Sequence, residues 1–474
     1  MLEEVHSDQL HMVFRDAVDK ISGLRFVYEH LDFSSSMGRQ LFLNTPWLST
    51  IDDINNALDE VEKYKKYLSA YQGISDLCVL LSEHVNIQGS IDVLKQKDSI
   101  CTDIDFFEFK KLALIDEKID KLSVKYNFNL SPRPSLLSLL SILDPNNDRL
   151  KSFFLSDAFE SSLLTIRNDI DHCNDEIRLA ELNLLLAQKE EDVRKKLTDA
   201  IRPFITELEL VQKALATDDM LISKAKWSHQ FGTIRPVPLT EGDTILKGLR
   251  HPAVECYLKK EGKAFQDVSI VFGNEPTLIT GANMSGKSVL LHAISISQAL
   301  MQFGMFVPAN QAQMVVVDEI AFSVGEGEDQ SKGLSSYGAE ILRINKIISK
   351  AKNGIKLLAI IDEPARTTNP QEGFALVQGL VKLFEKYQVR ALITTHYSGI
   401  SYKGRGWRVR GFTEHIDAPH LKVNQLEQYM DYSLENDEGY TVPHEAITIA
   451  KLLGVDTEYL ELSKQSIKAI QYEK

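Results

Sequence analysis

Apolar residues recur at alternating steps of four and three along residues 159–184, inside a stretch that has no glycine between residues 90 and 231. The repeat is formed by Phe159, Leu163, Ile166, Ile170, Cys173, Ile177, Ala180 and Leu184. This spacing places side chains on one face of a helix, and glycine is disfavoured in helix interiors. The pattern predicts one long helix whose apolar seam packs on a partner helix, and a plain helical bundle differs little from this interpretation.

The pattern changes from about residue 233 onward. Short β-rich runs at 268–272, 277–280, 314–317, 357–361 and 391–394 are mostly separated by stretches with helical spacing. Alternating strands and helices predict an α/β domain with a largely parallel sheet. After residue 430 a polar segment leads into a second helical pattern. We therefore predict three parts, which are a helical region at 1–232, an α/β domain at 233–429 and a C-terminal helical, dimer-forming segment at 430–474.

Composition narrows the class of protein. Apolar residues make up 43% and charged residues 25% of the 474 positions, as in ordinary globular proteins. No apolar run comes near the roughly 18 residues of a membrane helix, and we find no secretory signal. The four cysteines lack paired spacing, which predicts a reducing, cytoplasmic environment. A net charge of -14 disfavours DNA as the main partner, because duplex binding usually relies on a basic surplus.

A glycine-rich motif carries the strongest chemical signal. Residues 281–288 read Gly-Ala-Asn-Met-Ser-Gly-Lys-Ser, between an apolar strand and an apolar helical stretch at 289–301. Glycines let successive backbone N–H groups surround phosphate oxygens, and a helix N-terminus adds positive partial charge. In this pattern Lys287 bridges phosphate oxygens and Ser288 holds Mg²⁺ through its hydroxyl group. We favour a nucleotide site over a purely structural turn.

Two further strand ends carry candidate catalytic groups. The run at 357–361 ends in Asp362 and Glu363, which predicts a metal ligand followed by a general base or a group that orients water. In isolation such a pair is better interpreted as a solvated acidic turn, and the acidic pair at 318–319 competes with it. The run at 391–394 leads to His396, which we predict to sense the γ-phosphate, although a lone histidine there is more often structural.

Together these residues resemble the MutS-type ATPase family, a branch of the ABC-type ATPases. Residues 280–288 match the loop of that family except at Ala282 and Ser285, and weaker likenesses at 31–55 and 446–454 extend the resemblance over nearly the whole chain. The resemblance implies an adenine-stacking role for Phe265 and a composite site that a second subunit completes. It assigns nucleotide binding to Phe265, Gly281, Ala282, Asn283, Met284, Ser285, Gly286, Lys287, Ser288, Val289, Ser335 and Ser336.

The family's fold and reaction follow from the same resemblance. It implies an all-helical core and lever region, an ABC-type P-loop ATPase domain and short C-terminal helices. ATP and Mg²⁺ are the implied cofactors, and ATP is hydrolysed to ADP and phosphate in a homo- or heterodimer. Lys287, Glu363 and His396 are then catalytic, whereas Ser288 and Asp362 bind the metal.

Several parts of the family pattern have no counterpart in this sequence. We find no mismatch-reading domain before the core region, no glycine-rich DNA-clamp insert between the long helices and no nuclease-like tail. MutS-like chains of this kind are associated with reactivation of adenosylcobalamin-dependent aminomutases, which implies a protein client and no membrane partner. The alternative is DNA-structure binding in repair or recombination, without mismatch reading. Glu363 and His396 disfavour a third possibility, a non-catalytic scaffold.

Overall fold

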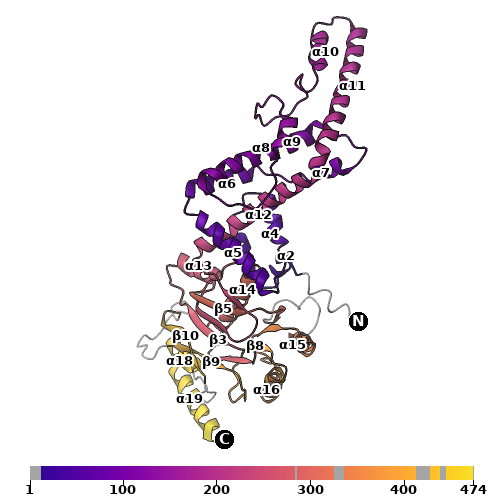
Figure 1. Ribbon diagram of the computed structural model, residues 1–474. Coiled ribbons are helices and arrows are strands. Elements are labelled where there is room, and N and C mark those ends of the chain that lie inside the picture. Colours follow the sequence, from indigo (N-terminus) through magenta and orange to yellow (C-terminus); the bar gives the residue numbers. More distant parts are fainter. Residues whose placement is uncertain (1–11, 283–284, 325–335, 413–426, 438–444, 473–474) are drawn as a thin grey trace. The chain divides into compact units, whose positions relative to one another are not determined.

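The structure of the protein is a computed structural model that describes residues 12–282, 285–324, 336–412, 427–437 and 445–472 (Figure 1). The chain divides into two compact units. The sheet unit consists of residues 1–30, 46–59 and 228–474, and the helical unit consists of residues 31–45 and 60–227. Within the described ranges, no helix combines the length and the apolar character needed to cross a membrane.

The units differ from the three parts expected from the sequence. One boundary falls at residue 227/228, close to the expected 232/233, but residues 12–30 and 46–59 pack with the sheets rather than with the helices. The C-terminal residues 430–474 belong to the sheet unit as well. A separate C-terminal segment that forms a dimer stays a prediction.

The helical unit consists of helices and the loops that join them, the longest of which spans residues 144–161. Its elements are α4 (Ser36–Leu43), the second half of α5 (Ile51–Tyr67), α6 (Tyr71–Ser82), α7 (Gln88–Lys95), α8 (Asp103–Tyr126), α9 (Leu137–Leu143), α10 (Ser162–Asp171), α11 (Glu176–Ile201), the 3-10 helix η1 (Arg202–Phe204) and most of α12 (Ile205–Gln230). The long helix α8 starts at a capping box, because the side chains of Thr102 and Asp105 each accept a hydrogen bond from the other's backbone N–H.

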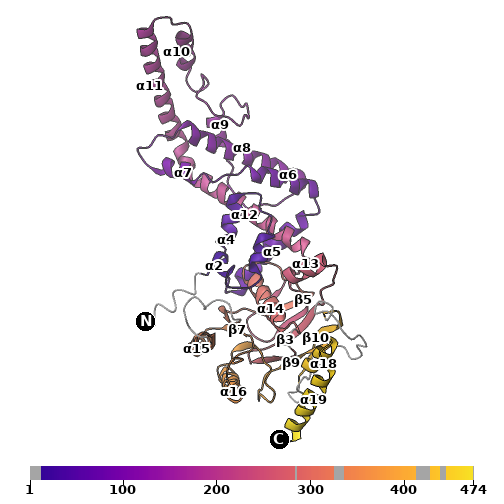
Figure 2. The same cartoon turned by 180° about the vertical axis from the view of Figure 1, so that it is seen from behind.

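The prediction of a single long helix across residues 159–184 is wrong. The structure has two helices, α10 and α11, which lie side by side in both Figure 1 and Figure 2. The side chain of Asp175 accepts hydrogen bonds from the N–H groups of Ile177 and Arg178, at 2.9 Å each, and so begins a new helix. Asn and Asp compete with helical hydrogen bonding in this way, and residues 171–175 read Asp-His-Cys-Asn-Asp.

Two β-sheets form the centre of the sheet unit. The smaller has the order β1 (Val237–Leu239), β5 (Gln311–Val315), β2 (Thr244–Leu249), β3 (Val268–Phe272). The larger has the order β10 (Met430–Asn436), β9 (Gly406–Phe412), β4 (Thr277–Thr280), β8 (Arg390–Thr394), β7 (Leu357–Ile361), β6 (Glu319–Ser323). All neighbours in the larger sheet are parallel except β10 and β9. The expectation of mixed helical and α/β structure with a parallel-rich sheet is therefore confirmed.

The strands expected from the sequence fall into both sheets. Residues 277–280, 357–361 and 391–394 enter the parallel sheet, but β3 and the run expected at 314–317 belong to the smaller sheet, where β5 ends at Val315. Sequence reasoning missed β1, β2, β6, β9 and β10. Its C-terminal helical segment begins instead with β10, which is antiparallel to β9.

The other elements of the sheet unit are helices. They are α2 (Phe14–Ala17), α3 (Leu24–Glu29), the first half of α5, α13 (Pro252–Lys260), α14 (Lys287–Gln302), α15 (Ser336–Lys352), α16 (Pro370–Lys386), the 3-10 helix η3 (Glu427–Tyr429), α18 (Glu445–Leu452) and α19 (Thr457–Tyr472). Nearly every residue of α14 from Leu290 to Gln302 is buried, as expected for a helix in the core. Because α14 directly follows the glycine-rich loop, the core fixes the position of that loop.

Candidate functional site

The glycine-rich loop joins the end of β4 to the start of α14. Gly286 is the N-cap of α14 and has a φ of 82°, in the left-handed region that a residue with a Cβ rarely adopts. A Cβ at this position would also lie 3.1 Å from Cδ1 of Tyr432. The first N–H groups of α14 have no acceptor within the helix, so they are available to bind an anion. Asn283 and Met284, both predicted to bind nucleotide, lie outside the described residues.

The side chain of Lys287 is held against the loop. It is only 6% exposed, and its Nζ atom donates hydrogen bonds to the carbonyl oxygens of Gly281 (2.9 Å) and Ala282 (2.7 Å). The same nitrogen lies 3.5 Å from Oε1 of Glu363. The ammonium group at the start of α14 therefore contacts both the glycine-rich loop and the residue that follows Asp362 after β7. The structure thus brings together Lys287 and Glu363, two of the residues that the sequence predicted to be catalytic.

A hydrogen-bonded chain connects α14 to the ends of β7 and β8. The hydroxyl group of Ser288 donates to Oδ2 of Asp362 at 2.6 Å. The buried hydroxyl of Thr394 donates to the other oxygen of that carboxylate and accepts the N–H of Glu363 at 2.8 Å. Because β7 and β8 are parallel neighbours, their carboxyl ends meet at the same edge of the sheet. One threonine hydroxyl therefore positions both predicted acidic residues, although sequence reasoning gave it no role.

Glu363 lies in a turn with unusual backbone geometry. Its φ is 47° and that of Ala365 is 60°, both in the left-handed region, which costs about 1–3 kcal/mol for a residue other than glycine. Two contacts hold the turn, because Ala365 N–H donates to Glu340 of α15 (2.7 Å) and the Tyr397 hydroxyl donates to the Ala365 carbonyl (3.0 Å). Gly373 leaves room for that hydroxyl, which would lie 2.0 Å from a Cβ there.

His396 lies two residues beyond β8 and is partly buried. Burial lowers its pKa, the Glu363 carboxylate raises it, and the positive charges of Arg366 and Lys287 lower it. The net shift is downward, so the imidazole is neutral near pH 7. A neutral imidazole has one N–H donor and one acceptor nitrogen. His396 thus shares an electrostatic environment with Lys287 and Glu363, and its role as a sensor stays a prediction.

His292 is a further residue near the site that sequence reasoning missed. It follows Ser288 by four residues on α14, a spacing that places both side chains on one helix face. Burial lowers the pKa of His292, and the Asp362 carboxylate opposes that shift. The neighbouring His251 caps α13 and has a pKa lowered to about 4, mainly by burial and next by His292. The i to i+4 spacing from Ser288 was the available sequence signal.

The competing acidic pair, Asp318 and Glu319, lies elsewhere in the sheet unit. Glu319 begins β6 and is in register with Leu357 at the start of β7, whereas Asp362 follows the end of β7. Oδ2 of Asp318 accepts the N–H of Lys356 at 2.8 Å, and Glu319 forms an ion pair with Lys350. The pair therefore lies at the opposite ends of the parallel strands from the glycine-rich loop.

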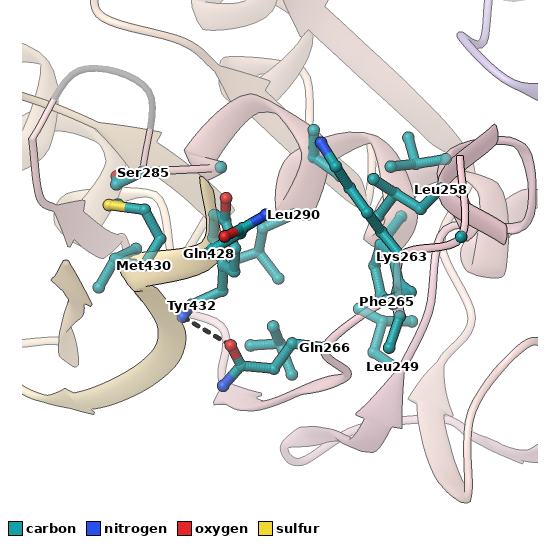
Figure 3. Close-up of a pocket in the computed structure, with 18 residues that line it drawn as sticks. Leu249, Leu258, Lys263, Phe265, Gln266, Ser285, Leu290, Gln428, Met430 and Tyr432 are labelled. Atoms are coloured by element: carbon teal, nitrogen blue, oxygen red, sulfur yellow. Dashed lines mark hydrogen bonds between the residues drawn. The ribbon is translucent and has the colours of Figure 1, made fainter. Parts of the chain in front are cut away.

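A cavity of about 610 Å³ adjoins the loop (Figure 3). Phe265 lines it, together with Ser285, Gly286 and Val289 from the loop and the start of α14. Tyr432 contributes from β10, and its backbone N–H donates to Oε1 of Gln266 at 3.0 Å. The lining also includes Leu249, Leu258, Leu290, Ala293, Val409 and Met430, so the cavity is largely apolar with a few polar groups. A largely apolar space next to a loop with available backbone N–H groups has the character of a pocket for a flat ring such as a nucleobase.

Two residues were expected to come from a second subunit, Ser335 and Ser336. Ser335 lies outside the described residues, and Ser336 is the first residue of α15. Oxygen donors suitable for a metal are Ser288 and Asp362, and the described part of the chain holds no group of three or more His, Cys, Asp or Glu side chains arranged for a metal ion. This donor set fits Mg²⁺, which commonly binds few protein oxygens and completes its shell with phosphate and water.

Comparison with known proteins shows what this part of the chain is similar to. Residues 277–471 match the family model described as MutS domain V. The DNA mismatch repair protein MutS of Caldanaerobacter subterraneus subsp. tengcongensis is 26% identical over 317 residues, which are 65% of this chain and 35% of that protein. The MutS proteins of Brevibacillus brevis and Geobacillus kaustophilus are 34% identical over 195 residues and 27% identical over 275 residues.

These matches cover 41% and 58% of this chain and 22% and 30% of the Brevibacillus and Geobacillus proteins. The chain therefore spans about a third or less of the length of these relatives. The chain is thus similar to MutS proteins, and the matched family model covers the segment that contains the glycine-rich loop, β7 and β8.

Proposed function

We propose that the chain is a MutS-like ATPase that binds ATP and Mg²⁺ at the start of α14 and hydrolyses ATP to ADP and phosphate. The observation that best supports this proposal is the hydrogen-bonded chain from Ser288 through Asp362 to Thr394 and Glu363. It joins the loop that carries Lys287 to two predicted acidic groups at the ends of neighbouring strands. A structural turn needs no such convergence.

Each residue at the site then has a defined role. Lys287 and the N–H groups at the start of α14 bind phosphate oxygens, and Phe265 stacks on the base in the adjoining cavity. Ser288 and Asp362 would hold Mg²⁺, which when bound would neutralise charge on phosphate oxygens. The ammonium group of Lys287 exchanges its contacts with Gly281, Ala282 and Glu363 for phosphate oxygens.

Glu363 is the proposed general base or water-orienting group. Its two carboxylate oxygens lie 3.5 Å from Lys287 and 3.4 Å from Arg366. Once phosphate engages Lys287, the carboxylate loses that ion pair and can accept a proton from water, while the backbone N–H of Glu363 stays fixed by Thr394. Neutral His396 supplies a hydrogen bond to the γ-phosphate as a sensor.

Replacement of Glu363 by Gln tests this assignment. We expect Glu363→Gln to bind ATP but to lose turnover, since glutamine keeps the size of the side chain and removes its basicity. The matched control is Glu319→Gln, which changes the competing acidic pair and should leave turnover near the wild-type rate. Phosphate release by Glu363→Gln at the wild-type rate would show that this carboxylate is not catalytic.

We further propose that two subunits share each site. The proposal is supported by the resemblance of residues 335–340 to a segment that reaches the partner's γ-phosphate in MutS-type proteins. ATP would close such a dimer, hydrolysis would open it, and the helices would transmit the motion to a client. Mixing Lys287→Ala with Ser335→Ala chains should restore activity in mixed dimers, where one site is intact. Activity no greater than the sum of the two parents, in dimers shown to be mixed, contradicts shared sites.

The client is proposed to be a protein, such as an adenosylcobalamin-dependent aminomutase that the ATPase reactivates. The net charge of -14 supports a protein over a nucleic acid, since DNA phosphates repel an acidic surface. The second candidate is DNA-structure binding in repair or recombination, supported by the curated relatives, which are DNA mismatch repair proteins. Steeply salt-dependent binding to branched DNA would favour that candidate.

A further inference from the structure

One face of α11 exposes the apolar residues that form the C-terminal end of the heptad repeat at residues 159–184. Ile177 is 77% exposed, Leu184 is 62% exposed and Leu185 is 41% exposed, and Ala180 between them is also exposed. These four residues, here called the exposed stripe, span just over two helical turns. The positions Ile177, Ala180 and Leu184 keep the three-and-four spacing of a helix that packs on another helix.

The neighbouring helix does not cover this face. Leu163 and Ile166 of α10 are buried, as is Leu182 of α11, whereas the stripe is exposed although α10 and α11 lie side by side (Figure 2). Leu182 lies two residues before Leu184, which places the two side chains on different sides of α11. Within the described residues the stripe is therefore an apolar helix face without a partner, and isolated exposed apolar residues do not usually repeat at heptad spacing.

The charges around the stripe determine which partner fits it. Residues 169–192 carry eight carboxylate side chains and two basic ones. Both basic residues lie on α11, where Arg178 already pairs with Glu181 at 2.9 Å. Asp169, Asp171 and Glu176 form no ion pair within the part of the chain that the structure describes. An acidic border repels DNA phosphates, and it also repels the same acidic face of a second copy.

We propose that the exposed stripe is a docking surface for a basic amphipathic helix of a partner protein. Leucine-like side chains at heptad spacing on that helix would pack between Ile177, Ala180 and Leu184, and its flanking lysines or arginines would face the carboxylates at the border. The inference rests on the proposed protein client, to which it gives a chemical character. Its test is independent of the ATPase site, which lies in the other unit.

The test uses a synthetic helical peptide with leucine at heptad positions a and d and lysine at e and g. Binding to the full-length protein is measured by fluorescence anisotropy over a range of salt concentrations, with a peptide carrying glutamate in place of lysine as comparison. We expect the basic peptide to bind more weakly as salt rises, and the acidic peptide not to bind. The double variant Ile177→Ser/Leu184→Ser should weaken binding by about tenfold or more.

The matched control is Leu150→Ser/Phe154→Ser, because these residues of the same unit are 58% and 64% exposed but lie outside the stripe. It should bind the basic peptide like the wild type. Equal weakening by both double variants overturns the proposal, as does equal binding of the acidic peptide. Self-association that only Ile177→Ser/Leu184→Ser abolishes, or branched DNA that displaces the peptide from the stripe, overturns it too.

ATP hydrolysis by the same preparations separates the two proposals. Both double variants should keep the wild-type rate, since neither touches the residues assigned to the nucleotide. If the peptide behaves as expected while the wild-type protein hydrolyses no ATP, the ATPase assignment fails and the docking surface stands. If the protein hydrolyses ATP but the peptide does not bind in a way that depends on the stripe, the docking surface fails and the ATPase assignment stands.

Discussion

Replacing Thr394 by valine removes the hydroxyl group that connects the two acidic residues of the site, while it preserves the shape of the side chain. The hydroxyl group of Thr394 is fully buried, donates to the Asp362 carboxylate and accepts the N–H of Glu363. A hydrogen bond to a charged group is worth about 1.5–3 kcal/mol and a neutral one about 1 kcal/mol. We therefore expect Thr394→Val to lower the free energy of unfolding by about 2–4 kcal/mol.

A matched control lies on the neighbouring strand. Thr277 of β4 is 1% exposed, and its hydroxyl has no hydrogen-bond partner among the described residues. Thr277→Val removes only an unpaired buried polar group, so its effect on stability should be near zero or favourable by about 1 kcal/mol. Urea unfolding followed by tryptophan fluorescence measures both variants, since Trp47 and Trp407 belong to the sheet unit.

The rate of ATP hydrolysis gives a second measurement on the same pair. Without the shared hydroxyl, Asp362 and Glu363 lose their common support, and small misplacements of catalytic groups cost about a hundredfold in rate. Thr394→Val should thus lower kcat by at least about tenfold, and Thr277→Val should leave it unchanged. Equal stabilities and equal rates for the two variants would refute the idea that the Thr394 hydroxyl organises the site.

Two further predictions concern other parts of the chain. His84 in the helical unit is 3% exposed, and burial followed by the charge of Lys111 lowers its pKa to about 4. Because the unfolded chain binds the proton more readily, stability is full above about pH 6.5 and is lost as pH falls toward 4, by about 2 kcal/mol between pH 7.5 and pH 5. Urea titrations at both pH values should show a smaller acid loss for His84→Leu, and an identical loss in both proteins would contradict a buried neutral imidazole. Phe265→Ala should weaken binding of a fluorescent ATP analogue by about tenfold through lost stacking, whereas Tyr257→Ala, which changes an exposed side chain outside the cavity, should not.

Local sequence signals accounted for the parts of the site that are close together in the chain. Gly286, Lys287 and Ser288 follow one strand, and Asp362 and Glu363 follow another, so strand ends and residue types were enough to predict them. Thr394 was overlooked because its role depends on β7 and β8 being neighbours, which local spacing does not reveal. Tyr432 reaches the cavity only because β10 pairs with β9 next to β4.

The long helix was mispredicted for a different reason. Heptad spacing continues through residues 171–175, but the side chain of Asp175 offers the backbone an alternative hydrogen bond that starts α11. Local capping thus prevailed over apolar periodicity. The same residues that were expected to form a buried seam, Ile177 and Leu184, are consequently exposed on α11.

The burial of α14 has a mechanical consequence. Its 16 residues form a stiff helix about 24 Å long that starts at Lys287 and ends at Gln302. At the far end, the Gln302 amide donates to the carbonyl oxygens of Leu48 (2.9 Å) and Val317 (2.7 Å). Close packing makes a buried helix stiff, so α14 directly connects the loop at Lys287 to the backbone at residue 48. Residue 48 lies three positions before α5, so a displacement of the proposed nucleotide site would be passed along α14 toward the start of that helix.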